Sequence, residues 1–190
     1  MVSPGSVHGG DAHVGEVTVG VAVAVPEPYA TELREHRASF GDTQADLVPT
    51  HVTLLPPTVV DVEQLADVRV HLGAVARRQR PFAMRLRGTG TFRPVSPVVF
   101  VAVAEGISEC ELLAEDVCSG PLAVEVPFPY HPHVTVAHDV AETELSRAFQ
   151  ALGSYACDFE VEDFALYVHD AAAGWRSDSV FRLRQDRLDE

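Results

Sequence analysis

The stretch HPHVTVAH, residues 131–138, decides the fold expected for this chain, because it reads as a β-strand with chemical groups on one face. Alternate residues of a strand point to opposite faces, so His133 and Thr135 project together while Val134 and Val136 project from the other side. Aliphatic residues on that second face indicate burial against a core. The strand is therefore predicted to hold an imidazole and a hydroxyl side by side on an anchored support.

A second stretch, THVTLLPP at residues 50–57, repeats this pattern in the first half of the chain. His51 and Thr53 share one face of the predicted strand, and Val52 and Leu54 lie on the other. One His-x-Thr triplet is a weak signal in a chain with nine histidines, and two triplets can still arise by coincidence. Two copies that are both strand-like and both flanked by aliphatic residues favour a paired site over coincidence.

The elements expected around the triplets follow the same order in both halves of the chain: a triplet strand, a helix directly after it, and two further strands. Periodicity and turn residues predict helices over 27–40, 61–80, 107–119 and 142–152. They predict strands over 17–25, 51–55, 82–87, 98–104, 133–137, 157–169 and 179–184. The last two strands, joined by the AAAG turn, read as an antiparallel hairpin, so the predicted fold class is α+β.

Composition limits the partners of the protein. The formal charge is -14, from 28 acidic and 14 basic residues, and every basic residue is arginine. Such a surface repels a long phosphate backbone, so DNA is excluded as a partner, while a local basic pocket for one phosphate is not. No segment reaches the roughly 20 apolar residues of a membrane span, so no membrane partner is expected.

The ends and the cysteines of the chain bear on domain organisation and compartment. Residues 1–15, MVSPGSVHGGDAHVG, lack the apolar core and basic start of a secretory signal and are predicted to be a flexible tail. Residues 16–190 are predicted to form a single domain, and we expect a monomer. Cys110, Cys118 and Cys157 are odd in number and form no CxxC pair, which is typical of free cysteines packed in a cytoplasmic protein.

The two triplets together fit the chemistry of a phosphodiester. Imidazole titrates near neutrality, so one histidine can take a proton from an attacking hydroxyl or water while the other gives a proton to the leaving oxygen. The threonine hydroxyls can donate hydrogen bonds to the non-bridging oxygens. No metal or other cofactor is needed for this scheme.

A metal site is the alternative interpretation of the second stretch. His131, His133 and His138 are three imidazoles within eight residues, and the first two can share a strand face. Pro132 interrupts that strand, and neither a carboxylate nor a cysteine stands at ligand spacing nearby. The sequence therefore favours acid–base chemistry over metal binding.

These segments resemble a known family. HVTL at 51–54, HPHVTVAH at 131–138 and RGTGTFRPVSPVVFVAV at 87–103 are similar to the two-histidine (2H) phosphoesterases, in particular to the bacterial 2′-5′ RNA ligase/cyclic phosphodiesterase group. The resemblance implies a two-lobed, pseudo-symmetric fold whose antiparallel sheets line a central cleft, with helices outside. It also implies metal-independent opening of 2′,3′-cyclic phosphates, or joining of RNA ends through a 2′-5′ bond.

Carried onto this chain, the resemblance implies that His51 and His133 are the catalytic pair and that Thr53 and Thr135 hold the phosphate. One position departs from the family: many relatives have an arginine three residues after the second threonine, where this chain has His138. We expect this difference either to weaken phosphate binding or to lower the pH optimum.

Further substrate contacts are predicted near the triplets. Tyr130 and Phe92, together with Phe128, are candidates to stack on a base, although aromatic residues beside strands often belong to the core. Arg93, in the basic run with Arg85 and Arg87, is a candidate phosphate contact, and ion pairing with nearby carboxylates is the alternative. His138 completes the predicted substrate-binding set.

The leading hypothesis is a cytoplasmic, metal-independent phosphoesterase that opens 2′,3′-cyclic phosphates of small nucleotides or RNA ends. A second hypothesis is 2′-5′ RNA end joining, although the acidic charge disfavours holding two RNA ends. A third is a nucleotide-binding protein of the same fold without catalysis. A two-histidine mechanism predicts a bell-shaped pH profile, whereas tight binding of a cyclic nucleotide without turnover would favour the binding protein.

Overall fold

The structure is a computed structural model that describes residues 15–124 and 128–184. The predicted tail at residues 1–15 lies outside the described residues except for Gly15. In the described part of the chain, no helix is both long and apolar enough to cross a membrane.

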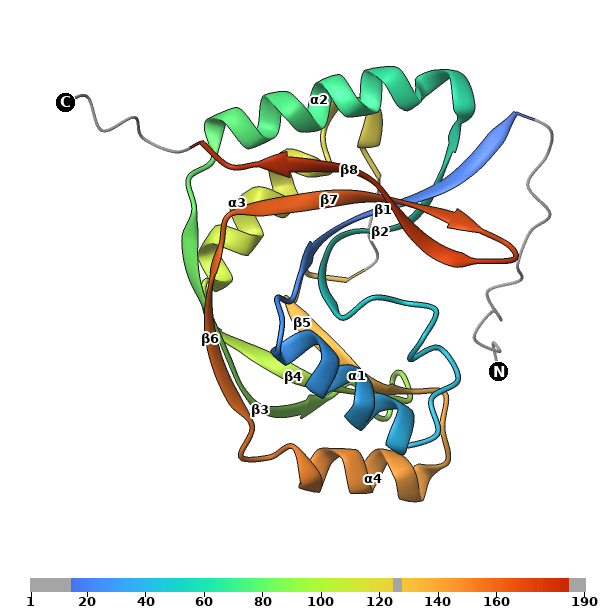
Figure 1. The fold of residues 1–190 in the computed structure, drawn as a ribbon, viewed down its shortest axis with the longest axis vertical. Coiled ribbons are helices and arrows are strands. Elements are labelled where there is room, and N and C mark those ends of the chain that lie inside the picture. The colour runs from blue at the N-terminus through green and yellow to red at the C-terminus, as the bar shows by residue number, and fades with distance from the viewer. Residues whose placement is uncertain (1–14, 125–127, 185–190) are drawn as a thin grey trace.

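Eight strands form two four-stranded antiparallel sheets. The first sheet has the order β2-β1-β7-β8, formed by His51–Asp61, Glu16–Ala24, Asp163–Asp170 and Gly174–Arg182. The second sheet has the order β5-β4-β3-β6, formed by His133–His138, Val98–Glu105, Phe82–Thr91 and Ala156–Val161. Four α-helices and two 3₁₀ turns complete the described fold: α1 Tyr29–Ser39, η1 Val62–Gln64, α2 Leu65–Arg78, α3 Ile107–Val117, η2 Gly120–Leu122 and α4 Glu142–Ala151. The predicted α+β class with antiparallel sheets is confirmed (Figure 1).

Each His-x-Thr strand is an edge strand of its sheet. On β2, His51 lies opposite Ala24 of β1, and on β5, His133 lies opposite Ala102 of β4. The two edges meet, because β2 contacts β5. A sheet edge is the place where side chains from two sheets can approach without a strand between them, so this arrangement joins the two triplets.

Helices α1 and α3 are exchanged between the sheets. Helix α1 follows β1 of the first sheet but packs against β5 of the second, whereas α3 follows β4 of the second sheet and packs against β2 and α2. Figure 1 shows α1 and α4 at one end of the molecule and α2 at the other. This exchange brings residues of α1 close to the end of β5, beside the place where β2 and β5 are in contact.

Several predicted boundaries were wrong. The strand predicted over 157–169 is two strands that separate at Glu162, because the chain there passes from the second sheet to the first. The helix predicted over 61–80 begins as the 3₁₀ turn η1, where the side-chain oxygen of Gln64 accepts a hydrogen bond from the backbone N–H of Asp61 at 3.2 Å. The final strand begins at Gly174 rather than at 179, and β3 extends to Thr91 rather than to 87.

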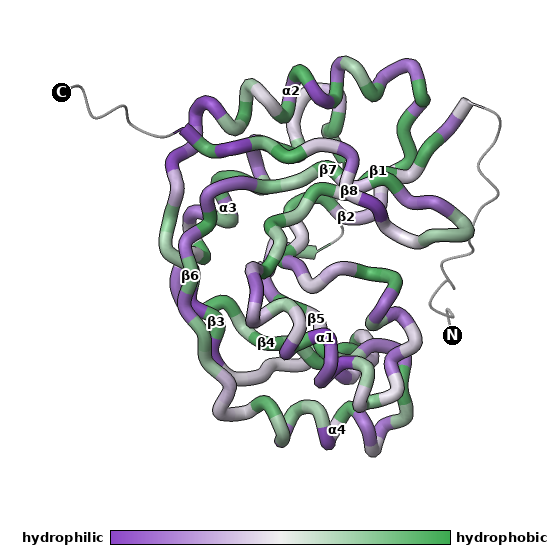
Figure 2. Tube along the Cα trace, viewed as in Figure 1, coloured by the Kyte–Doolittle hydropathy of each residue, from purple (hydrophilic) through white to green (hydrophobic). Residues whose placement is uncertain are grey.

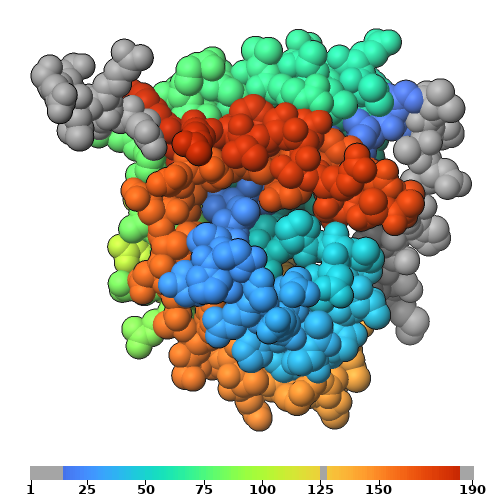
Figure 3. Space-filling model, viewed as in Figure 1, coloured from blue at the N-terminus to red at the C-terminus, as the bar shows by residue number. Residues whose placement is uncertain are grey.

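One apolar core lies between the sheets and the inner faces of the helices. Helix α2 alternates hydrophobic and hydrophilic residues in Figure 2, and its buried side chains include Val68, Leu72 and Val75. The three cysteines are free, as predicted, and two of them, Cys110 and Cys157, are buried. The space-filling view in Figure 3 shows a hollow where the segment leading into β2 faces the β7–β8 hairpin.

Candidate active site

The two triplets present the faces predicted for them. Val52 and Leu54 are 0% and 1% exposed, and Val134 and Val136 are 1% and 0% exposed. The histidines and threonines on the opposite face are partly exposed on both strands. The apolar face therefore fixes each strand in the core, and the polar face is left for chemistry.

His51 is oriented by the backbone that precedes it. Its Nδ1 lies 2.6 Å from the carbonyl oxygen of Pro49, and its Nε2 lies 3.1 Å from Oγ1 of Thr53. A carbonyl oxygen only accepts, so Nδ1 must carry a proton, and Nε2 of the neutral ring is left as an acceptor. Nε2 is thus the atom that can take up a proton, and it lies next to the threonine hydroxyl.

His133 is held in the same way. Its Nδ1 lies 2.7 Å from the carbonyl oxygen of His131, which is again two residues earlier in the chain. The ring contacts Phe92 edge-on and is also in contact with Phe100, with ring centroids 5.0 Å apart in both cases. Both imidazoles therefore have the same tautomer, with Nε2 as the atom available to a substrate.

Burial is the main cause that lowers the pKa of both histidines. For His51, the hydrogen bond to Pro49 opposes this shift and the charge of Arg37 adds to it. For His133, the hydrogen bond to His131 opposes the shift, while the charges of His131 and His51 lower the pKa further. The positive charge of a protonated His51 thus disfavours a second proton on His133.

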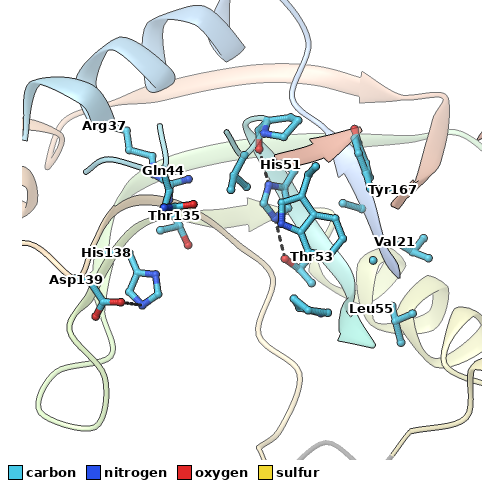
Figure 4. A pocket seen from close by; sticks show the side chains of 16 residues that line it. Val21, Arg37, Gln44, His51, Thr53, Leu55, Thr135, His138, Asp139 and Tyr167 are labelled. Carbon is cyan, nitrogen blue, oxygen red and sulfur yellow. Dashed lines mark hydrogen bonds and ion pairs between the residues drawn. The ribbon is translucent and has the colours of Figure 1, made fainter. Parts of the chain in front are cut away.

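A cavity of about 540 Å³ opens beside His51 and Thr53. In the view of Figure 4, Arg37, Gln44, Thr135 and His138 lie on one side of these two residues, and Val21, Leu55 and Tyr167 lie on the other. The labelled residues on the first side are polar, whereas Val21 and Leu55 on the second side are apolar. A ligand with an anionic end and a flat apolar end fits this division.

The structure brings three of the four predicted catalytic residues to this cavity. His51, Thr53 and Thr135 line it, whereas His133 is outside the lining and packs against Phe92. The strands that carry His51 and His133, β2 and β5, are in contact.

The predicted substrate-binding residues lie in different surroundings. His138 lines the cavity, with its Nε2 3.3 Å from a carboxylate oxygen of Asp139. The Tyr130 hydroxyl donates to the carbonyl oxygen of Thr53 at 2.9 Å, which ties the segment before β5 to β2. Neither Phe92 nor Tyr130 is among the cavity-lining residues.

Arg93 lies outside the cavity lining. Its guanidinium forms an ion pair with Glu142 at the start of α4 and donates to the Ser146 hydroxyl at 3.2 Å. This is the ion-pairing alternative that the sequence left open. Arg85 of the same basic run pairs with Asp158 and Glu105 on the second sheet.

The cavity residues that the sequence reasoning missed include Arg37, Gln44, Tyr167 and Trp175. Trp175, the single tryptophan of the chain, packs over Gly20 of β1, where a Cβ atom would lie 3.3 Å from the indole. None of the four is adjacent to a triplet in the sequence. Only the sheet order, which places β7 next to β1 and β8 next to β7, brings Tyr167 and Trp175 near His51.

The histidine cluster considered as a metal site is spread out in the structure. The rings of His131 and His133 have centroids 6.2 Å apart, and His138 faces Asp139. Within residues 15–124 and 128–184, no group of three or more histidine, cysteine, aspartate or glutamate residues is arranged to hold a metal ion.

Two edge strands, each with a histidine held at Nδ1 by the carbonyl two residues earlier, are in contact beside a cavity. A family model of the 2′-5′ RNA ligase superfamily matches residues 25–173, which include both triplets. The chain therefore belongs to the 2′-5′ RNA ligase superfamily. The Bacillus cereus (strain ATCC 10987) protein named "Putative phosphoesterase" is 28% identical over 144 residues, which are 75% of this chain and 83% of the relative.

Solved structures show the same fold. Escherichia coli LigT, crystallised with 3′-AMP, matches with a TM-score of 0.65 and 21% identity over 90% of this chain and 99% of its own. The Thermus thermophilus protein TT0787 matches with a TM-score of 0.63 and 28% identity over 90% of this chain and 100% of its own. The predicted two-histidine fold is confirmed by these likenesses.

Proposed function

We propose that this protein opens 2′,3′-cyclic phosphates of nucleotides or RNA ends by metal-independent acid–base catalysis. The observation that carries the proposal is the equivalent setting of His51 and His133. Each is held at Nδ1 by the carbonyl two residues earlier, which leaves Nε2 for the substrate. The membership in the 2′-5′ RNA ligase superfamily agrees with chemistry at a ribose phosphate.

The proposed reaction needs one neutral and one protonated imidazole. The neutral Nε2 takes a proton from water while the water oxygen forms a bond to phosphorus. The bond from phosphorus to one ribose oxygen breaks, and the protonated Nε2–H of the other histidine gives its proton to that oxygen. The hydroxyls of Thr53 and Thr135 donate to the non-bridging oxygens, where negative charge concentrates. The product is a ribose phosphomonoester, and exchange of protons with water restores the starting pair.

The lowered pKa values of His51 and His133 suit this cycle. A histidine that is largely neutral near pH 7 can act as a base. The pair as a whole needs only one proton, so the other histidine can be protonated while the first stays neutral. The rate should therefore pass through a maximum below the ordinary pKa of histidine, about 6.5. A lower pH optimum was also one of the two consequences expected from His138.

The apolar side of the cavity supports a nucleoside as the remainder of the substrate. Tyr167 and Trp175 are aromatic residues within it, and stacking on a base is tolerant of base identity. Escherichia coli LigT, which shares the fold, has been crystallised with 3′-AMP, NADP+ and ATP. We propose that this chain also takes a small nucleotide or the end of an RNA strand.

Joining of RNA ends through a 2′-5′ bond is the second candidate function, and the family match favours it. It uses the same two histidines with a ribose hydroxyl in place of water. The net charge of -14 opposes the binding of two RNA strands, so hydrolysis is the preferred proposal.

Hydrolysis of nucleoside 2′,3′-cyclic phosphates in the presence of EDTA tests the proposal. His51→Asn and His133→Asn keep an N–H near the carbonyl partner but remove Nε2, and each should lower kcat by about 10²–10⁴-fold. His36→Ala is the matched control, because His36 stacks on Phe40 at the end of α1 and does not line the cavity.

Each possible result of this assay has a definite meaning. Turnover that needs a divalent metal, or that survives both asparagine substitutions, would contradict the proposal. Ligation of two RNA halves without hydrolysis would favour the second candidate. Tight nucleotide binding with no turnover would favour a non-catalytic binding protein.

A further inference from the structure

Arg37 is a buried cation in the wall of the cavity that the mechanism above does not use. It lies near the end of α1, and its side chain is 9% exposed. Among the cavity-lining residues, all of which belong to the described part of the chain, it is the single arginine or lysine. In a protein with twice as many acidic as basic residues, a positive charge at this place requires an explanation.

Asp42 holds the guanidinium of Arg37 in a defined orientation. Nε of Arg37 donates to Oδ2 of Asp42 at 2.7 Å, and the Asp42 side chain is 1% exposed. The same carboxylate accepts the backbone N–H of Gln44 at 2.9 Å and that of His138 at 3.1 Å. Asp42 thus connects α1, the segment before β2 and the end of β5, and its negative charge is shared among three donors.

The terminal nitrogens of Arg37 remain for another partner. In the hydrogen bonds and ion pairs of residues 15–124 and 128–184, its guanidinium contacts Asp42 through Nε alone. A planar guanidinium that uses one of its five N–H groups has capacity left for a ligand. Two N–H groups in the same plane match the spacing of two oxygens on a phosphate.

Arg37 also lies on the side of the cavity where a phosphate would be held. Figure 4 shows Arg37 beside Gln44 and Thr135, on the side that His138 occupies. Its charge reaches the candidate base, because it lowers the pKa of His51. A cation on this side of the cavity therefore lies within electrostatic range of the reacting group.

We propose that Arg37 binds the phosphate of the substrate through its terminal guanidinium nitrogens and that Asp42 is the residue that positions it. The inference rests on the proposed function for the identity of the ligand, a phosphate ester. The chain has His138 where its sequence resemblance leads one to expect an arginine. Arg37 supplies the positive charge from α1 instead, and Asp42 bonds to both residues.

Binding of inorganic phosphate, measured by isothermal titration calorimetry, tests the inference without any need for turnover. Arg37→Gln should weaken phosphate binding by at least about tenfold, since charge-assisted hydrogen bonds are lost. Arg37→Lys should bind phosphate with an affinity between those of the wild type and Arg37→Gln, because lysine keeps the charge without the planar guanidinium. Arg34→Gln is the control: Arg34 lies on the same helix, pairs with Asp46 and does not line the cavity, so phosphate binding should not change.

Three additional measurements separate ligand binding from a purely structural ion pair. If Arg37→Gln unfolds because Asp42 is left buried and unpaired, Arg37→Gln/Asp42→Asn removes both charges and the same loss of phosphate binding is expected. Asp42→Asn alone should raise KM more than it lowers kcat, because it loosens Arg37 without touching the histidines. The histidine signal of His51 should titrate at higher pH in Arg37→Gln than in the wild type.

The outcomes distinguish this inference from the proposed function. Folded Arg37→Gln that binds phosphate as the wild type does would overturn the inference, as would a wild type without saturable phosphate binding. Wild-type hydrolysis with an unchanged KM in Arg37→Gln would overturn it and leave the proposed function standing. Phosphate binding that depends on Arg37, in a wild type that hydrolyses no cyclic phosphate, would support the inference and refute the proposed function.

Discussion

Replacing Gly90 by alanine should disturb the imidazole of His133 without touching it, because the ring of Phe100 lies between them. Gly90 of β3 is the register partner of Phe100 of β4, and the phenyl ring lies across the glycine. The same ring is in contact with His133, at a centroid distance of 5.0 Å, and with Phe92 at 4.6 Å. A methyl group at position 90 therefore pushes on the support of the histidine.

The size of the effect follows from the distances. A Cβ atom on Gly90 would lie 2.4 Å from Cζ of Phe100, and ordinary contact begins at 3.4 Å, so the ring must retreat by about 1 Å. Phe100 is 5% exposed and has little room to move. Overpacking of this kind costs about 1–3 kcal/mol of unfolding free energy. A displacement of about 1 Å at a reacting group lowers the rate by about 10²-fold.

Urea unfolding and cyclic phosphate hydrolysis measure the two effects separately. Gly73→Ala is the matched control, since a Cβ atom there would meet the Arg77 side chain at an ordinary 3.6 Å. Alanine is preferred over glycine inside a helix by about 1 kcal/mol, so this control should be stabilised and fully active. Gly90→Ala/Phe100→Leu should recover part of the activity. A Gly90→Ala variant with wild-type stability and rate would refute the reasoning.

Three further outcomes are expected. Burial lowers the folded-state pKa of His51 and His133, so the unfolded chain binds more protons than the folded chain below about pH 6.5, and the free energy of unfolding should fall as the pH drops below that value. In urea unfolding, the difference in unfolding free energy between the wild type and His51→Asn/His133→Asn should therefore shrink with acid. A difference that stays constant with pH would contradict the lowered pKa values. Tyr130→Phe removes the hydrogen bond to the carbonyl oxygen of Thr53 and should lower the free energy of unfolding in urea by about 1 kcal/mol. An unchanged free energy of unfolding would show that this hydrogen bond does not stabilise β2. Trp175→Ala should raise KM for nucleoside cyclic phosphates by roughly tenfold or more but not for a cyclic phosphate without a base, and equal changes for both would exclude stacking.

The chemistry-bearing face of each triplet was predictable from the sequence, because the two-residue period of a strand is a local property. His51 and Thr53 share a face for the same reason that Val52 and Leu54 are buried, and no long-range information is needed. The α+β class followed from the same local patterns. The proximity of the two triplets depends on the contact between β2 and β5, which no local pattern encodes.

Pairing partners were not predictable. Residues 157–169 have continuous strand character, and nothing in their sequence marks the change of sheet at Glu162. The same limit applies to the cavity walls. Phe92 and Arg93 were chosen because they resemble ligand-binding types in a family-like segment, but Arg37 and Trp175 line the cavity because of helix exchange and strand order. Neighbours in sequence are a poor guide to neighbours across two sheets.

The pairing of β1 with β7 has a consequence for synthesis of the protein. The first sheet joins residues from the beginning of the chain to residues from its end, so β1 and β2 leave the ribosome long before β7 and β8 exist. Until then β1 has an open edge, and such edges are prone to wrong pairing. We expect folding to wait for nearly the whole chain. A product that ends before Asp163 would contain both His-x-Thr strands and still fail to build the cavity.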